Sequence, residues 1–279
     1  GVFMAFLAYK SQFESRISSL IDQFVQIKML SLHAERLADI VLTETESEHI
    51  PDAGFPDIGG NVEINVKNVS FRYSDNEPYV LKNIDFYVKQ GESLALTGRS
   101  GCGKSTLLDI LSGCLKPGSG SITVNGYDIY NMPSRFIRSI SATVRQDDVL
   151  FSGSIAENIS FFDETPDHSQ IEHCARLAVI HDEITQMPMG YETLIGDMGS
   201  TLSGGQKQRI ILARALYKKP KILFLDEATA HLDTTNEQIV SRNLHRLPIT
   251  IVMAAHRKET VASADRTICL DARVSEIDS

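Results

Sequence analysis

Apolar residues recur along this chain in distinct patterns, and each pattern predicts a different kind of structure. From residue 10 to residue 42 they return at steps of three and four, as in Ile17, Leu20, Ile21 and Phe24, with charged residues between them. That spacing predicts a long amphipathic helix. The helix either packs on the same chain or extends the end of a transmembrane helix into the cytoplasm, and the pattern alone favours neither interpretation.

The segments on either side of this helix indicate how the chain is organised. Residues 1–9 are apolar, but Lys10 follows too early for a complete membrane span, so we expect the chain to be a fragment of a longer protein. Residues 43–60 combine acidic residues with Pro and Gly without any periodicity, which indicates a linker. We therefore expect a domain boundary near residue 60 and a separate domain over residues 61–279.

Beyond the linker the pattern becomes that of strands and helices. Apolar and polar residues alternate over 62–73, with a change of phase that predicts a strand with a bulge, exposed on one face. Short apolar runs at 93–97, 222–225 and 249–253 predict parallel strands that are buried on both faces. Residues 167–187 and 206–218 are predicted to be helical. The expected fold is α/β, with a mainly parallel sheet, an antiparallel β edge and an α-helical insertion.

Composition narrows the possible partners. The chain has 279 residues and a net charge of −9, which argues against a protein that binds the phosphate backbone of nucleic acids. Its four cysteines have neither disulfide-framework nor metal-ligand spacing, so we expect reduced thiols. No nucleic-acid partner is expected.

A glycine-rich loop supplies the first candidate chemistry. The motif G-x-x-x-x-G-K-[ST] occurs between the predicted strand 93–97 and a predicted helix over 106–112, which is the context that a phosphate-binding loop requires. Its glycines let successive N–H groups converge on phosphate oxygens, Lys104 adds a positive charge, and Ser105 is placed to bind Mg²⁺. The alternative is a glycine-rich turn that matches by chance. The candidate nucleotide-binding residues of the loop are Gly98, Arg99, Ser100, Gly101, Cys102, Gly103, Lys104, Ser105 and Thr106.

Two further segments suit the same ligand. The buried run 222–225 leads to Asp226, a candidate Mg²⁺ ligand, and to Glu227, a candidate general base for the attacking water. The alternative is a carboxylate pair that caps the next helix. Leu202-Ser-Gly-Gly-Gln206 is a helix start whose backbone amides offer a second place to hold an anion.

Three isolated residues have chemistry that matters only beside a nucleotide. The ring of Tyr73, at the expected end of the first strand, could stack on a purine. The amide of Gln146 could reach Mg²⁺ or water, and His256 could donate to a γ-phosphate. Spacing alone favours ordinary structural roles for these three residues.

In their order along the chain, these elements resemble the nucleotide-binding domain of ABC transporters. The resemblance covers about residues 60–279, and Leu202–Gln206 makes it highly specific. It implies adenine stacking by Tyr73, a Mg²⁺-binding and coupling role for Gln146, and a γ-phosphate contact for His256. It also implies that Ser203, Gly204 and Gly205 touch ATP bound to the opposite copy of a head-to-tail dimer. On the same ground Gln206 and Asp233 are counted as nucleotide-binding candidates.

Finer features of the resemblance point to peptide secretion. Residues 146–159 look like an exporter segment, and Gly196-Asp-Met-Gly199 is similar to colicin V-type transporters, which carry an upstream cysteine-peptidase domain. Residues 1–42 look like the end of the last transmembrane helix and its cytoplasmic extension. The resemblance implies ATP-driven export of a peptide or bacteriocin across the bacterial inner membrane, with this domain on the cytoplasmic side. The implied partners are a second copy, the transmembrane domain of the same full-length chain, the peptide and, in a Gram-negative cell, a periplasmic adaptor and an outer-membrane channel.

The sequence departs from the family pattern at some positions, and other classes of protein are alternatives to a peptide exporter. The segment Ala228-Thr-Ala-His-Leu-Asp233 has lost a usual serine and gained His231 at the implied dimer interface, which could alter coupling between copies. Cys102 is interpreted as a small loop residue rather than a redox sensor. An exporter of toxins or lipids is the main alternative. Ser203 lies only 99 positions after Lys104, which is too short a distance for the coiled-coil insertion of a DNA-repair ATPase, and a P-loop kinase has no use for Leu202–Gln206.

Overall fold

The computed structural model describes residues 1–42, 60, 62–196, 202–228, 232–255 and 257–271. The chain divides into two compact units, Gly1–Ser47 and Glu48–Ser279, and each is considered by itself. The predicted linker, apart from Gly60, lies outside the described residues. Three further parts of the chain for which the sequence predicts a function also lie outside the described residues: 197–199, His231 and His256.

The first unit consists of one long helix, α1, over Val2–Val41. It begins earlier than the predicted residue 10, so the apolar opening of the chain is helical as well. No side chain of α1 is buried, and large apolar residues such as Phe3, Phe13 and Phe24 are exposed. No helix in the described ranges combines the length and the apolar character that a membrane span needs. Both interpretations of this helix therefore stay predictions.

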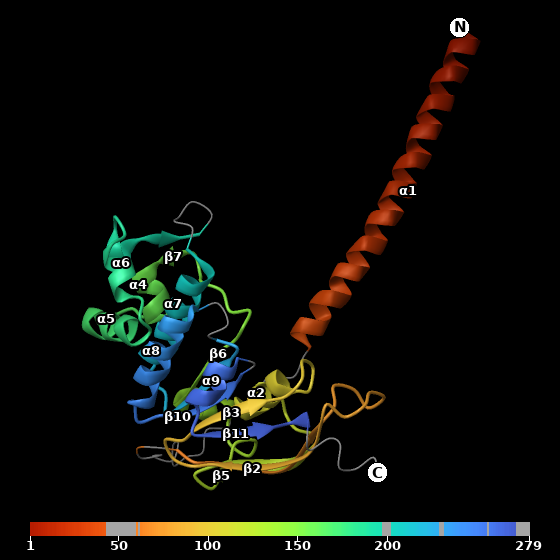
Figure 1. Cartoon of the computed structure of the whole chain (residues 1–279). Helices are drawn as coiled ribbons and strands as arrows, with labels where there is room; N and C mark the ends of the chain where they lie inside the picture. The colour runs from red at the N-terminus through yellow and green to blue at the C-terminus, as the bar shows by residue number, and fades with distance from the viewer. Residues whose placement is uncertain (43–59, 61, 197–201, 229–231, 256, 272–279) are drawn as a thin grey trace. The chain divides into compact units, whose positions relative to one another are not determined.

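The second unit is built on two main sheets (Figure 1). A parallel sheet of five strands has the order β11-β3-β10-β9-β6, and an antiparallel sheet of four strands has the order β2-β1-β4-β5. The parallel strands are β3 (Ser93–Thr97), β6 (Ser141–Val144), β9 (Ile222–Asp226), β10 (Thr250–Ala254) and β11 (Arg266–Cys269). The antiparallel strands are β1 (Ile64–Phe71), β2 (Leu81–Val88), β4 (Ser119–Val124) and β5 (Tyr127–Asp128). The three short apolar runs in the sequence are β3, β9 and β10, which confirms their prediction as buried parallel strands.

The parallel sheet is buried on both faces because its alternate residues enter two different hydrophobic cores. In β3, Leu94 and Leu96 join the core shared with the antiparallel sheet, whereas Ala95 joins the core beneath the helices. The same division separates Ile222 and Phe224 from Leu223 and Leu225 in β9. Side chains of a strand alternate between the two faces of a sheet, so a continuous apolar run is what this central position requires.

The antiparallel sheet contains the predicted bulge. The pairing of β1 with β2 shifts register between Val66 and Val69, where the sequence changes phase, and Asn68 there has a φ of 49°. The strand ends at Phe71, however, so the expectation that Tyr73 ends it is wrong. Residues 72–80 leave the sheet before β2 begins at Leu81, and Tyr73 lies in this connection.

Helices complete the second unit. Two helices that lie between β3 and β6 in the sequence pack near the parallel sheet, namely α2 (Lys104–Leu111) and α3 (Ser134–Ile140). The helical region comprises α4 (Ile155–Ser160), α5 (His168–Leu177), α6 (His181–Thr185), the 3-10 turn η1 (Gly190–Glu192) and α7 (Gly204–Tyr217), with a short sheet of β7 (Gly153–Ser154) and β8 (Leu194–Ile195). The chain then forms α8 (Thr234–His245) and α9 (Lys258–Ser263). Figure 1 shows α4–α7 gathered at one end of this unit and the antiparallel sheet at the other.

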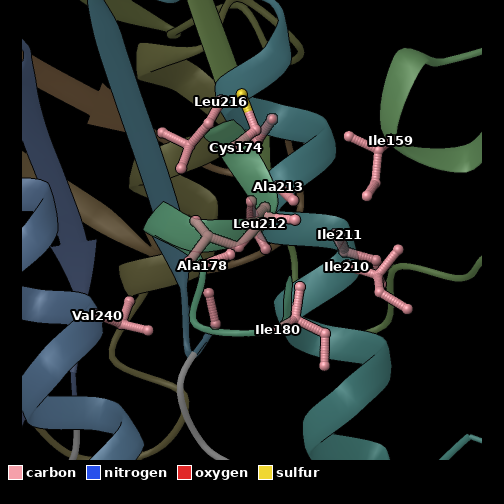
Figure 2. Close-up of a cluster of buried hydrophobic side chains, with 14 of the residues drawn as sticks. Ile159, Cys174, Ala178, Ile180, Ile210, Ile211, Leu212, Ala213, Leu216 and Val240 are labelled. Atoms are coloured by element: carbon pink, nitrogen blue, oxygen red, sulfur yellow. The ribbon is translucent and has the colours of Figure 1, made fainter. Parts of the chain in front are cut away.

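The helical region packs through an apolar cluster that α7 shares with α4, α5 and α8 (Figure 2). Ile210, Leu212 and Ala213 of α7 are at most 2% exposed, as is Cys174 of α5. Residues 167–187 are helical as predicted, and they form the two helices α5 and α6. Val179 has a left-handed φ of 58°, which ends α5 and lets Ile180 turn into the core.

Candidate nucleotide-binding site

The glycine-rich loop joins the carboxyl end of β3 to the start of α2, as its motif predicts. Gly98 and Gly103 have φ angles of +144° and +94°, which L side chains rarely adopt. A Cβ at Gly103 would lie 2.8 Å from Leu81 Cδ2, and one at Gly98 would lie 2.7 Å from Cys102 Sγ. Both the backbone conformation and the lack of space therefore require glycine at the two ends of the loop.

Lys104 holds the loop in a curve. Its side chain is buried, and Nζ donates hydrogen bonds to the carbonyl oxygens of Gly98 at 3.0 Å and Arg99 at 2.9 Å. Cys102 Sγ lies 3.7 Å from the same Nζ. No side chain caps α2, whose N-cap is Gly103, so the start of this helix presents backbone N–H groups beside a fixed positive charge. That combination suits a phosphate chain.

The glycine-rich loop also contacts Asp271, a residue that was not predicted from the sequence. Its Oδ2 accepts a hydrogen bond from the backbone N–H of Arg99 at 2.7 Å. β11 pairs with β3 so that Cys269 lies opposite Thr97, and the chain after β11 therefore passes beside the loop. Because the two residues are 172 positions apart, no local motif could have indicated this pairing.

The strand ends bring Asp226, Glu227 and Gln146 to the same edge as the loop. In the parallel sheet Ala254 lies opposite both Leu96 and Asp226, and Val144 lies opposite Leu225. Asp226 is thus at the carboxyl edge, and exposed Gln146 follows β6 two residues after its end. Burial raises the pKa of Asp109 on α2, Arg145 opposes that rise, and the negative charge of Asp226 adds to it.

The donors at this edge fit Mg²⁺. They are the hydroxyl of Ser105, the carboxylate of Asp226 and the amide of Gln146, all hard oxygen ligands. Among the described residues no group of three or more His, Cys, Asp and Glu side chains could hold a metal. The three oxygen donors suit an ion that completes its shell with substrate phosphates, which is the usual habit of Mg²⁺.

Glu227 adopts an unusual backbone conformation. It follows Asp226 directly and has a φ of 49°, and its N–H donates to the carbonyl oxygen of Ala254 at 3.3 Å. A left-handed conformation at a non-glycine residue costs about 1–3 kcal/mol and is found disproportionately at active sites. This outlier is at the residue for which a general-base role is predicted.

Tyr73 lies beside the loop helix although it is outside the strand. Its hydroxyl is 3.0 Å from Thr106 Oγ1, in the first turn of α2. The ring packs edge-on against Phe71 with 5.0 Å between centroids, yet the residue is 59% exposed. The ring therefore has an anchored position and a free surface on which a base could stack.

The start of α7, at Ser203, differs from the start of α2 because side chains cap it. Ser203 is the N-cap of α7 and forms a capping box with Gln206: Ser203 Oγ accepts from the Gln206 N–H at 3.2 Å, and Gln206 Oε1 accepts from the Ser203 N–H at 2.8 Å. Ser203 and Gly204 are exposed. Within the described residues, no hydrogen bond or ion pair joins this segment to the phosphate loop.

Asp233 has a structural role that is visible in this chain by itself. It is the N-cap of α8, and its carboxylate accepts hydrogen bonds from the N–H of Asn236 at 2.9 Å and from Asn236 Nδ2 at 2.7 Å. These bonds lower the pKa of Asp233. Its expected nucleotide contact stays a prediction, as do the roles of His256 and His231, which lie outside the described residues.

Comparison with known proteins decides the family. The sequence profile described as ABC transporter matches residues 81–230, which is more than half of the chain. The chain belongs to the ABC transporter family. It is 46% identical over 270 residues to the "Probable microcin-H47 secretion/processing ATP-binding protein MchF" of Escherichia coli, and 45% identical over 270 residues to the colicin V secretion/processing ATP-binding protein CvaB of the same species. Each alignment covers 97% of this chain and 38% of the relative, so the chain spans well under half the length of these relatives.

A solved structure supports the same assignment. The structure of a bacterial Atm1-family ABC exporter with ATP bound superimposes with a TM-score of 0.78 and 33% sequence identity, over 88% of this chain and 43% of that one. The predicted ABC ATPase fold is thereby confirmed, with its parallel core sheet, antiparallel sheet, helical region and preceding N-terminal helix. The predicted resemblance to bacteriocin secretion transporters is confirmed as well.

Proposed function

We propose that this chain is the ATP-binding and ATP-hydrolysing part of a bacterial exporter, and that two copies close head to tail on two ATP molecules. The observation that carries the proposal is the contrast between two helix starts. The phosphate loop with buried Lys104 is a complete cradle on one chain. The exposed start of α7 is prepared for an anion but has no bond to that cradle.

In this proposal each residue has a defined task. The loop and Lys104 bind the phosphates, Tyr73 stacks on the adenine, and Ser203, Gly204 and Gly205 contact the nucleotide on the opposite copy. Ser105, Asp226 and Gln146 hold Mg²⁺, which neutralises phosphate charge. Glu227 accepts a proton from the attacking water, and His256 contacts the γ-phosphate. Hydrolysis then weakens the closed dimer and lets the two copies separate.

A cleft whose lining includes residues that soon follow Gln146 in the sequence suits a helix or loop of the membrane domain. It has a volume of about 760 Å³, and its lining includes Val149, Phe151, Phe161 and Arg214. Phe151 and Phe161 are 46% and 63% exposed and lie 5.9 Å apart between ring centroids, with the Arg214 guanidinium 5.1 Å from the Phe151 ring. Exposed apolar clusters of this kind mark interaction sites. The cluster starts three residues after Gln146, so a docked segment would be connected to the nucleotide edge.

A buried amide holds the backbone of Phe151 and the side chain of Arg214 in this cleft. Asn158 is fully buried, its Oδ1 accepts from the Phe151 N–H at 2.9 Å and from Arg214 Nη2 at 2.7 Å, and its Nδ2 donates to the Phe151 carbonyl at 3.0 Å. A partner would therefore meet a rigid surface, which reduces the entropy lost on docking.

We further propose that the exported cargo is a peptide of the bacteriocin class. The support is the high similarity to MchF and CvaB, whose names describe microcin and colicin V secretion and processing. On this proposal the chain works with the transmembrane domain of its full-length protein at the bacterial inner membrane, on the cytoplasmic side. A periplasmic adaptor and an outer-membrane channel would complete the route in a Gram-negative cell.

The decisive test is Glu227→Gln. Removing a general base costs about 10²- to 10⁴-fold in rate. We expect the variant to bind ATP normally, to lose turnover by that factor and to accumulate as an ATP-dependent dimer in size-exclusion chromatography with light scattering. Glu164→Gln, a change of the same charge at an exposed loop position, serves as the control. ATPase activity near that of the wild type in Glu227→Gln would contradict the assignment.

A further inference from the structure

A carboxylate on α6 contacts the first two turns of α7, with one hydrogen bond in each turn. Glu183 Oε2 accepts a hydrogen bond from Gln206 Nε2 at 2.9 Å, and Glu183 Oε1 accepts one from Arg209 Nη1 at 2.6 Å. Burial would raise the pKa of Glu183, but the bonds from Arg209 and Gln206 outweigh it and lower the pKa, despite the nearby negative charge of Asp233. The group is therefore ionised at neutral pH and acts only as an acceptor.

This contact determines the orientation of the Gln206 amide. Gln206 Oε1 accepts from the Ser203 N–H as part of the capping box, while its Nε2 donates to Glu183. A carboxylate can accept but not donate, so the amide cannot rotate by half a turn without facing Glu183 with its oxygen and Ser203 with its NH₂ group. Glu183 thus reaches Ser203 through one intervening side chain.

Arg209 fastens the same turn from inside the protein. It is 5% exposed, and besides Glu183 it donates from Nη1 to the Val179 carbonyl at 2.5 Å and from Nε to the Gly205 carbonyl at 3.2 Å. Val179 is the left-handed residue between α5 and α6, and a β-branched residue in that region is a true outlier. The strained turn is held by backbone bonds on both sides, Val179 N–H to Arg176 O at 3.1 Å and Ile180 N–H to Ala175 O at 2.9 Å.

We propose that Glu183 is a positioning residue for the second half of the nucleotide site. Through Gln206 and Arg209 it holds Ser203, Gly204 and Gly205 in the conformation that meets the nucleotide of the opposite copy. The inference rests on the proposed function, because that half-site works only when two copies close. Arg209 neutralises the carboxylate, so Glu183 can lie near the start of α7 without adding a net negative charge beside the incoming phosphates.

The test compares ATP-dependent dimer formation with nucleotide binding to the separate chain. Glu183→Gln is made in the Glu227→Gln background, because this background is expected to accumulate the closed dimer. The new amide has one acceptor oxygen where Gln206 and Arg209 both donate, so one of the two bonds is lost. We expect the ATP concentration at half-maximal dimerisation to rise about tenfold or more, in line with the loss of a charge-assisted hydrogen bond. Binding of a fluorescent ATP analogue to dilute single chains should change less than about twofold, since the phosphate loop is untouched.

Three further variants separate positioning from a general structural role. Glu172→Gln removes an equivalent charge from an exposed α5 residue whose Oε2 lies 3.2 Å from Arg176, and it should leave dimerisation unchanged. Glu183→Asp keeps the charge and should restore part of the dimerisation. Adding Glu183→Gln to Gln206→Ala should cost less than the sum of the two single effects, because both act through the same amide.

The possible failures are distinguishable. If Glu227→Gln itself forms no ATP-dependent dimer, the proposed function is wrong. If it forms the dimer and Glu183→Gln leaves the midpoint unchanged, only the role of Glu183 is wrong. Equal losses of single-chain binding and of dimerisation in Glu183→Gln would also overturn that role, since they would indicate a general loss of structure.

Discussion

The starts of α2 and α7 both present backbone amides to solvent, yet the protein constructs them in opposite ways. At α2 the N-cap is a left-handed glycine, no side chain caps the helix, and buried Lys104 supplies positive charge from beneath. At α7 a serine caps the helix, its capping box uses the amide of Gln206, and the surface is exposed. The first site is a finished concave cradle. The second is a surface whose shape is set in advance by its own cap and by Glu183, and it becomes a site only against another surface.

The largest expected effect would break the first site alone. In Lys104→Ala the charge disappears and the carbonyls of Gly98 and Arg99 lose their donor. Hydrogen bonds to charged groups contribute about 1.5–3 kcal/mol, so binding of a fluorescent ATP analogue to dilute single chains should weaken roughly ten- to hundredfold. Lys67→Ala, at an exposed position of β1, is the matched control and should bind normally. Unchanged affinity in Lys104→Ala would mean that the loop is not the nucleotide cradle.

A smaller effect should separate capping from nucleotide contact at the second site. Ser203→Ala removes the side-chain member of the α7 capping box, and Ser154→Ala removes the same group from the capping box that Ser154 forms with Glu157 at α4. Each change should lower the free energy of unfolding by about 1 kcal/mol, measured by urea denaturation. Only Ser203→Ala is expected to lower ATPase activity while single-chain ATP binding stays normal. Equal ATPase losses in both variants would reduce the role of Ser203 to helix stability.

The smallest effect concerns a third helix start, at α8. Hydrogen bonds from Asn236 lower the pKa of the Asp233 carboxyl, so its ionised form stabilises the fold above the unfolded-state pKa, which is about 3.9. This stabilisation is lost as the pH falls through the lower folded-state pKa. Asp233→Asn should therefore be less stable than the wild type near neutral pH, and the difference should shrink as the pH falls through the lowered folded-state pKa of Asp233.

The test measures the urea concentration at which half of the protein is unfolded, for Asp233→Asn and for the wild type, from pH 7 downwards. Asp22→Asn, in the middle of exposed α1, should show no comparable difference between the two proteins. A pH-independent difference for Asp233→Asn would show that the charge of the cap is irrelevant to stability.

Much of this molecule follows from local sequence. The residues 94–96 and 222–225 are apolar without interruption because both faces of the parallel sheet are buried, and this pattern predicts such strands without a structure. The bulge near Asn68 is predicted by a change of phase in the alternation of apolar and polar residues. One prediction was wrong where the chain leaves a regular element, because Tyr73 lies beyond its strand. The segment 167–187 is helical as predicted, but it bends at Val179 between α5 and α6. A helical pattern cannot show such a bend, because apolar spacing says nothing about a left-handed residue that tertiary contacts hold in place.

The sequence by itself determined the chemistry of the two helix starts, since glycine conformations, a following lysine and a serine cap act within a few residues of each other. Only the tertiary structure decided what holds each start in place. The amide of Arg99 meets Asp271 because β11 pairs with β3, and Gln206 meets Glu183 because α6 turns back onto α7. Hydrogen bonds between groups distant in sequence depend on strand register and helix packing, and these are properties of the whole folded unit.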